Sequence, residues 1–408
     1  MSDLYVIMKI LSNDYFSNIP GKKQVFSGGP KSFAGVISKH MKGNGYVWVS
    51  VVHRYGETDG VHAEHIIENK KHEWWVVETA ETYMQNEFTN PKEYKPLAET
   101  GSLLVDTLEE ILDREKPDLV FINGLSAFVW ALLVAATHKK IPVVVQHAGI
   151  MTFEVANYAH RFSRAGLRTM YGIEKDFARK ATTNVFLNSY SKKVFEKEVL
   201  ETKKGAAVII PLPCEAPKVI PKKKVKATKR VEIGVVARWD KIKNHKAILD
   251  LAEYTRTQGA PWRISAVTQI PDTNVQAEFK GAYRKHVRVL PPRSPRALRT
   301  FYRSMDIMLL PSNFDVSPHV VLEAAFEGVP TVMSPHVGYA TTLRRNGASE
   351  FVVDFKNIPK AYNQISALIK KNYPATLVKK FATEHNPARV MHQYEQCFLK
   401  VVGGVIKK

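Results

Sequence analysis

Cysteine is scarce in this sequence. Only two cysteines occur among the 408 residues, Cys214 and Cys397, which excludes a disulfide framework and a cysteine-based metal site. So little cysteine is typical of a reducing compartment, and we expect a cytoplasmic protein. The opening run LYVIMKIL is too short to span a membrane, and it lacks the basic start and cleavage site of a signal peptide. We interpret this run as a first β-strand.

Several cofactor and nucleic-acid motifs are also missing. No GxGxxG follows the first strand, so a dinucleotide cofactor is not supported, and no P-loop GxxxxGK[ST] occurs. No Asp-x-Asp pair is present, so we expect no bound metal and no other cofactor. Zinc-finger, RRM and KH signatures are absent as well.

Negative charge is sparse in the second half of the chain. Residues 1–217 hold 26 Lys+Arg and 25 Asp+Glu, whereas residues 218–408 hold 33 and 14, so nearly all of the net charge of +20 lies in the second half. Such a field attracts nucleotides, phosphates, anionic lipid or nucleic acid. Simple solubility would account for the excess equally well.

Two parallel α/β domains are predicted. A chain of this length is too long for one ordinary core. Short apolar runs alternate with helical stretches in both halves, as expected for parallel strands covered by helices. The Pro-rich and basic segment 211–230 interrupts this pattern. We predict two Rossmann-like domains facing across a cleft, over residues 1–217 and 231–385, with a linker at 218–230 and a C-terminal helix at 386–408 that returns to the first domain.

The stretch 312–328 combines two acids with a predicted helix start. Ser317 is expected to cap the helix and Pro318 to occupy its first position, so the N–H groups of His319, Val320 and Val321 would form an anion site.

Asp315 precedes this helix in a loop, and Glu323 lies inside its apolar run. A carboxylate there needs partners. The hydroxyl groups of a ribose or another sugar would provide them, and so would a structural salt bridge.

Three further loops follow predicted strands. Arg238 and Lys243 lie after the strand VEIGVVA, with Asn244 as the expected cap of the next helix, and two cations there would neutralise a diphosphate. The other two loops contain Gly28 with Gly29 and His147, which are weaker signals because a glycine pair or a single histidine is common.

Two helical stretches carry arginine at helical spacing. Eight Lys+Arg and no acid occur from Lys280 to Arg303. A surface for nucleic acid or anionic membrane and an ordinary solvated face are both consistent with this pattern. The arginines in question are Arg296, Arg299 and Arg303 in the second half, and Arg161, Arg164 and Arg168 in the first.

Together these stretches resemble the retaining glycosyltransferases of family four, which have the GT-B fold. GVVARWDKIKNH and DIMLLPSNFDVSPHVVLEAAFEGVPTVMSPHVG are similar to the two motifs of the family's second domain. FSGGPKSF, VVVQHAG and the terminal NPARVMHQYEQCFLKV are similar more loosely. Asp315 stands where the family usually has Glu, and Ser317-Pro318-His319 replaces its usual glycine turn.

The resemblance implies transfer of a sugar from a UDP- or GDP-linked donor to an acceptor hydroxyl, with retention of configuration and without metal. Arg238 and Lys243 would bind the diphosphate, Asp315 the sugar and Glu323 the ribose. The resemblance also implies that the backbone of His319 to Val321 meets phosphate, that Gly28 and Gly29 face the donor, and that His147 lies near the sugar. His147, Asp315, Arg238 and Lys243 form the candidate catalytic set, but none is assigned as nucleophile or general base.

The acceptor stays open among a glycan, a lipid at a membrane surface and a nucleic acid, including a modified base in DNA. The net charge also permits peripheral contact with an anionic membrane. The rival interpretations are an epimerase or phosphorylase on the same scaffold, and a non-catalytic nucleic-acid-binding protein.

Overall fold

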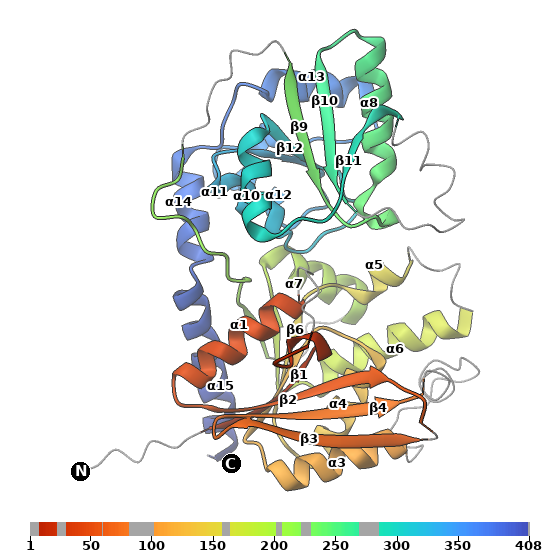
Figure 1. Ribbon diagram of the computed structural model, residues 1–408, viewed down its shortest axis with the longest axis vertical. Coiled ribbons are helices and arrows are strands. Elements are labelled where there is room, and N and C mark those ends of the chain that lie inside the picture. Colours follow the sequence, from red (N-terminus) through yellow and green to blue (C-terminus); the bar gives the residue numbers. More distant parts are fainter. Residues whose placement is uncertain are drawn as a thin grey trace. The chain divides into compact units, whose positions relative to one another are not determined.

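The computed structural model describes residues 8–22, 30–58, 60–80, 102–156, 164–200, 206–221, 230–268 and 285–406. The chain divides into two compact units (Figure 1). The first comprises Met1–Leu212 with Val390–Lys408, and the second comprises Pro213–Arg389. Among the described residues, every helix is either too short or too polar to cross a lipid bilayer.

The first unit is built on an eight-stranded sheet in the order β3-β4-β2-β1-β5-β6-β7-β8. Its strands are parallel except β3, which pairs antiparallel with β4 at the edge of the sheet. The pairing of β3 with β4 was not predicted from the sequence. The strands are β1 (Lys9–Asp14), β2 (Val47–Tyr55), β3 (Val61–Asn69), β4 (His72–Thr79), β5 (Leu119–Asn123), β6 (Val143–His147), β7 (Thr183–Phe186) and β8 (Ala207–Ile209).

Helices cover both faces of this sheet. One face packs on α3 (Leu103–Glu115), α4 (Ala127–His138) and α6 (Arg164–Lys180), where they bury a shared apolar core. On the other face, the Phe121 ring of β5 lies 5.7 Å from Tyr394 and 5.3 Å from Phe398. Tyr394 and Phe398 both belong to α15 (Pro387–Ile406). The ring of Phe33, on α1 (Pro30–Gly43), lies 5.2 Å from that of Tyr394.

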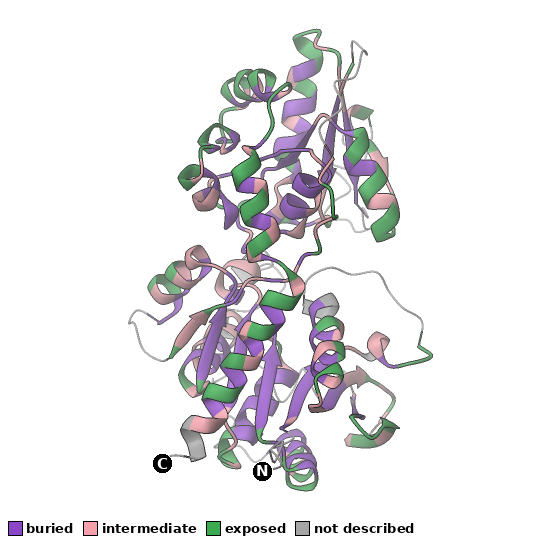
Figure 2. Cartoon of the chain, turned by 90° about the vertical axis from the view of Figure 1, so that its left-hand side faces the viewer, coloured by how far each residue is buried: buried purple, intermediate pink, exposed green. Residues whose placement is uncertain are grey.

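The second unit is built on a five-stranded parallel sheet in the order β11-β10-β9-β12-β13. These two parallel-sheet units confirm the predicted fold class. Their buried strands stand out in Figure 2. The elements of the second unit are β9 (Val231–Val236), α8 (His245–Thr257), β10 (Trp262–Val267), β11 (Arg288–Leu290), α10 (Pro295–Ser304), β12 (Ile307–Leu310), α11 (His319–Phe326), β13 (Thr331–Met333), α12 (Tyr339–Arg345), α13 (Ile358–Leu368) and α14 (Ala375–Glu384).

The order of these strands determines where a ligand can bind. From β9 the chain moves outward through β10 and β11, and then returns to the other side of β9 as β12. The strand order therefore reverses between β9 and β12. In open α/β sheets, ligands bind beyond the carboxyl ends of the strands at such a point. The loops that follow β9 and β12 are the two for which the sequence predicts cations and acids.

Candidate functional site

The loops after β9 and β12 are joined by hydrogen bonds to backbone carbonyls. The N–H of Asn313 donates to the carbonyl of Ile242 over 2.7 Å, and the Asn244 side chain donates to the carbonyl of Pro311 over 3.2 Å. Two loops distant in sequence thus form one surface at the carboxyl edge of the sheet.

Lys243 and Asp315 form an ion pair in this surface. The ammonium of Lys243 lies 2.6 Å from Oδ2 of Asp315, and both side chains are mostly but not fully buried. A buried charge is stable only when it is paired. Lys243, which is predicted to bind the diphosphate, and Asp315, which is predicted to bind the sugar, are therefore neighbours, and each fixes the position of the other.

The β9 loop is stiffened from within. Asp240 accepts a hydrogen bond from the N–H of Ile242 and so begins a short 3₁₀ turn, Lys241–Lys243. His245 donates from Nε2 to the carbonyl of Arg238 over 2.8 Å and stacks on the Trp239 ring. Burial lowers the pKa of His245 to about 4, so this ring is neutral at physiological pH. Lys243 therefore projects from a turn with few alternative conformations.

Arg238 differs from Lys243 in its exposure. Its side chain is 65% exposed and lies 3.5 Å from Asp240, so it can move toward a ligand at little cost. Asn244 precedes α8 as predicted, but it has a left-handed backbone with φ of 54° and its side chain makes no capping hydrogen bond.

The α11 helix begins one residue later than the sequence predicts. Pro318 occupies the cap position and His319 is the first helical residue. Ser317 does not cap the helix, because its hydroxyl instead lies 3.1 Å from the Tyr339 hydroxyl. The N–H of Val321 donates to the carbonyl of Pro318 over 3.2 Å and is not free for an anion. Only the N–H groups of His319 and Val320 remain without a hydrogen-bond partner among the described residues.

Glu323 is held by a hydroxyl group. The Tyr302 hydroxyl of α10 donates to Oε2 of Glu323 over 2.6 Å, and no ion pair to a described residue is found for this carboxylate. The structural salt bridge is formed by Glu327, the residue that follows the end of α11. There the buried Glu327 pairs with Arg303 at 2.5 Å and with Arg299 at 3.8 Å. Glu323 and Glu327 therefore have different surroundings.

The His319 ring is a polar group that sequence analysis considered only for its backbone. Its Nε2 is buried and has no hydrogen-bond partner among the described residues. Burial lowers the pKa of His319, and the nearby carboxylates of Glu323 and Asp315 only partly oppose this effect. A neutral imidazole thus lies near both acids with one nitrogen unsatisfied.

His147 is enclosed within the first unit. It is the last residue of β6 rather than part of the loop, and its side chain is 1% exposed. Nε2 donates to Asn184 over 2.8 Å, and the ring stacks on Phe186 and packs against Phe195. Burial lowers the pKa of this histidine to about 4. Its Nδ1 has no hydrogen-bond partner among the described residues, and contact of this ring with a sugar stays a prediction.

The remaining predicted residues fall into two groups. Gly28, Gly29 and Arg161 lie outside the described residues, and only the backbone of Arg164, at the start of α6, is described. Arg168 is exposed on α6. On α10, Arg296 is exposed, whereas Arg299 and Arg303 neutralise Glu327. That part of the basic face has a structural role, because it compensates a buried acid.

One cluster in the first unit has the residue types of a metal site. Ligand atoms of His65, Glu73 and Glu115 all lie within 4.8 Å of one another. Cationic side chains of the protein, however, already contact Glu115 and His65. Lys9 lies 2.6 Å from Oε2 of Glu115, and Arg114 donates to Nδ1 of His65 over 3.1 Å. His65 must then carry its proton on Nε2, where it donates to Glu73 over 2.8 Å. The cluster is satisfied as a hydrogen-bond network and does not need an ion.

Comparison with known proteins identifies the second unit. Residues 218–385 match the family model described as Glycosyl transferases group 1. These residues form a glycosyltransferase domain. The match agrees with the resemblance seen in the sequence, and the two-unit fold of the chain is of the GT-B type.

Solved structures extend the likeness in fold to the whole chain. Sucrose-phosphate synthase from Thermosynechococcus elongatus matches with a TM-score of 0.72 at 13% identity, covering 97% of this chain and 100% of that one. The UDP-forming α,α-trehalose-phosphate synthase from Burkholderia xenovorans, in complex with glucose-6-phosphate, matches with a TM-score of 0.67 at 11% identity, covering 96% and 99%.

An E. coli structure described as trehalose-6-phosphate bound with UDP-2-fluoro glucose matches with a TM-score of 0.64 at 12% identity, covering 97% of this chain and 98% of that one. At these identities the likeness concerns the fold alone. No curated protein sequence matches the chain.

Proposed function

We propose that this glycosyltransferase transfers a sugar from a nucleoside-diphosphate sugar to an acceptor hydroxyl, with retention of anomeric configuration. The observation that carries this proposal is the meeting of Lys243, Asp315 and the start of α11 at the point where the strand order reverses. The Lys243–Asp315 pair is 2.6 Å apart there, and two N–H groups of the helix start have no partner among the described residues.

In this proposal the leaving diphosphate is stabilised by charge. Lys243 is a fixed cation on a stiff turn, and the exposed Arg238 is a mobile one whose planar fork suits phosphate. The N–H groups of His319 and Val320 add the partial positive charge of a helix N-terminus. Preorganised donors of this kind lower the barrier because negative charge grows on the diphosphate as the glycosidic bond breaks.

Glu323 and Asp315 bind the two sugars of the donor. Oε2 of Glu323 accepts from Tyr302, which leaves Oε1 to accept a ribose hydroxyl. Asp315 is mostly buried, and Lys243 contacts only its Oδ2, so Oδ1 can accept a hydrogen bond from a hydroxyl of the transferred sugar. The unsatisfied Nε2 of His319 is a further candidate for a donor oxygen.

We infer that the donor is UDP-linked and that the transfer needs no metal. The first inference is supported by two structural neighbours, of which one is named as UDP-forming and another is bound with UDP-2-fluoro glucose. The second is supported by Lys243, Arg238 and the helix start, which together provide the positive charge that a metal would otherwise supply.

A donor-by-acceptor screen read by mass spectrometry tests the proposal. UDP-glucose, UDP-N-acetylglucosamine and GDP-mannose would each be paired with glucose 6-phosphate, a glycolipid in vesicles and duplex DNA carrying hydroxymethylated cytosine, with and without EDTA. We expect product with a UDP-sugar, and an α-linked donor should give an α-linked product.

Four outcomes would overturn parts of the proposal. Interconversion of the donors without transfer would indicate an epimerase, and formation of sugar 1-phosphate from an oligosaccharide and added inorganic phosphate would indicate a phosphorylase. Tight DNA binding without turnover of any donor would favour a non-catalytic nucleic-acid-binding protein. Loss of activity in EDTA, restored by a divalent cation, would refute metal independence alone.

A further inference from the structure

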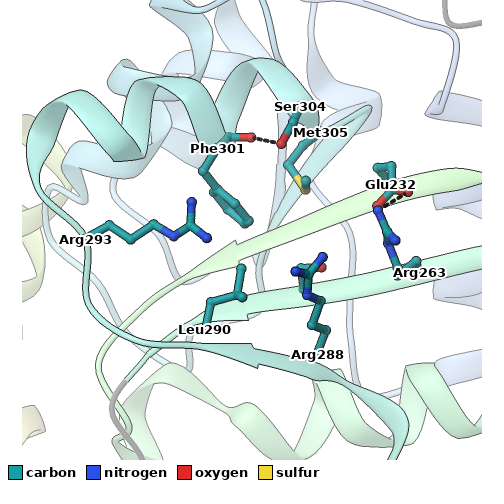
Figure 3. A pocket seen from close by; sticks show the side chains of 9 residues that line it. Glu232, Arg263, Arg288, Leu290, Arg293, Phe301, Ser304 and Met305 are labelled. Atoms are coloured by element: carbon teal, nitrogen blue, oxygen red, sulfur yellow. Dashed lines mark hydrogen bonds and ion pairs between the residues drawn. The ribbon is translucent and has the colours of Figure 1, made fainter.

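The second unit contains a pocket of about 300 Å³ between α10 and the strands β10 and β11 (Figure 3). Its walls include Glu232 and Arg263, which lie near the beginnings of β9 and β10 rather than at their carboxyl ends. None of Arg238, Lys243, Asp315 or Glu323 lines it. The pocket is therefore separate from the residues proposed to bind the donor.

Strand register explains why polar side chains line this pocket. Glu232 pairs with Arg263, and Ser265 pairs with both Gly234 and Arg288. Paired residues in a parallel sheet point to the same face. The alternate residues, such as Ile233 and Ala266, belong to the apolar core of the unit. A parallel sheet usually has two apolar faces, so polar residues along one face at this edge are a departure.

One carboxylate and one guanidinium of the pocket neutralise each other. Arg263 meets Glu232 through two contacts, from Nε to Oε2 and from Nη2 to Oε1, each of 2.7 Å. This two-pronged geometry is the strongest form of the arginine–carboxylate pair. Glu232 is buried, so it remains with Arg263 and does not compensate any other charge in the pocket.

Two further guanidinium groups have no such compensation. Among the described residues, neither Arg288 nor Arg293 forms an ion pair with a carboxylate. Arg288 extends from β11, and the guanidinium carbon of Arg293 lies 5.6 Å from the centroid of the Phe301 ring. The two side chains reach the pocket from either side of Leu290 (Figure 3). Two like charges that converge on one small space favour an anion there.

We propose that this pocket binds the phosphate group of a small phosphate monoester. Arg288 and Arg293 contact the phosphate oxygens, and the organic part packs against Phe301, Leu290 and Met305. Arginine is suited to this task because its planar donors match phosphate oxygens in pairs. The volume is that of a small-molecule site and is too small for a nucleic-acid helix.

Phosphate titration of the full chain tests this proposal. The background is the double variant Arg238→Met/Lys243→Met, which removes the cations of the proposed donor site, so that a failure of the proposed function leaves the result interpretable. Inorganic phosphate is added in 150 mM NaCl and followed by isothermal titration calorimetry. We expect one saturable site in this background, weakened at least about tenfold by adding Arg288→Met and Arg293→Met.

Arg296→Met is the matched control, because Arg296 is exposed on α10, which forms one wall of the pocket, but does not itself line the pocket. It should leave phosphate binding unchanged. An equal loss in this control would show that only the general positive field attracts phosphate, and no loss with Arg288→Met and Arg293→Met would refute the site. Circular dichroism checks folding, and Arg288→Met alone carries the test if the combined variant unfolds.

A second arm separates the pocket from a surface for nucleic acid. A fluorescent single-stranded oligonucleotide is titrated against the same variants. If Arg288→Met and Arg293→Met weaken oligonucleotide binding but leave phosphate binding intact, the arginines serve a polyanion surface and the monoester site is refuted. Loss of phosphate binding with little change in oligonucleotide affinity supports the pocket.

Discussion

The Tyr302 hydroxyl donates to Oε2 of Glu323 over 2.6 Å and so joins α10 to α11. Tyr302 is almost completely buried, and the carboxylate it holds is only half-buried. The hydroxyl occupies one oxygen of Glu323 and leaves the other for a ligand. We therefore regard Tyr302 as a positioning residue for donor binding.

Tyr302→Phe should raise KM for the donor about three- to tenfold and leave kcat nearly unchanged, because the aligned carboxylate contributes to binding before the chemical step. Steady-state kinetics across donor concentrations measures this split. Tyr373→Phe is the control, since the Tyr373 hydroxyl is also buried but bonds to the backbone of Thr331. A rise in KM with both variants would indicate a general structural effect.

Glu323→Gln should lower kcat/KM about 10- to 100-fold while the protein stays folded, because the amide is a weaker acceptor for hydroxyl groups and no ion pair to a described residue is lost. Glu327→Gln should do the opposite. It weakens the contacts with Arg299 and Arg303, which are more than half exposed and stay solvated, and should lower the free energy of unfolding by about 1 kcal/mol. Urea denaturation and kinetics on both variants check this contrast. If Glu323→Gln proves the less stable of the two, its carboxylate is structural.

Lys243→Met should lower kcat/KM about 100-fold, because it removes a fixed cation from the leaving diphosphate. Inhibition by free UDP should weaken in parallel, since UDP carries the same group. Lys246→Met is the control, as Lys246 is exposed and pairs with Asp250 on the outer face of α8. Unchanged UDP inhibition in Lys243→Met would mean that Lys243 serves only to hold Asp315.

The stability of the protein should fall as the pH drops from 6.5 toward 4. Burial lowers the pKa of His147 from 6.5 to about 4, so between these values the unfolded chain binds a proton that the folded chain does not. This group adds a slope of at most about 1.4 kcal/mol per pH unit in that window and none above it. Asp14 and Glu174, whose pKa values are raised by burial, oppose this trend. Urea denaturation of His147→Gln from pH 4 to 7.5 isolates the slope, and an unchanged slope would contradict the assignment.

Gly234→Ala should destabilise the second unit by about 1–3 kcal/mol. A Cβ at Gly234 would lie 2.8 Å from Cγ of Met305 and closer still to Sδ of Met308, so the end of α10 would have to shift. Gly43→Ala is the control, because a Cβ there meets no atom within 4 Å. Thermal denaturation compares the two, and a normal melting temperature for Gly234→Ala would show that the methionines adapt.

The sequence predicted the two-sheet fold because buried parallel strands leave a clear apolar signature. It also indicated which loops carry cations and acids. It did not reveal that Lys243 and Asp315 pair, because that contact depends on β9 lying next to β12, across a separation of 72 residues. Tyr302 was missed for the same reason. Nothing in the sequence around Tyr302 indicates that its hydroxyl donates to Glu323.

The ends of two elements lie one residue from where the sequence predicts them. The run VVVQHAG does not specify whether His147 ends the strand or begins the loop, and that difference decides whether the ring faces solvent or Phe195. Similarly, Ser317-Pro318 is a good helix start, yet the Tyr339 hydroxyl takes up the Ser317 side chain and the helix begins at His319. At this helix start, a competing hydrogen bond of one side chain decides the boundary.

The path of α15 has a consequence for biosynthesis. Tyr394 and Phe398 complete the core around Phe121, yet they are synthesised more than 270 residues after it. The second unit is a continuous stretch, Pro213–Arg389, and all of it precedes them. During synthesis, the second unit can therefore fold before the first. The first unit is complete only when the residues of α15 that cover its sheet have been made.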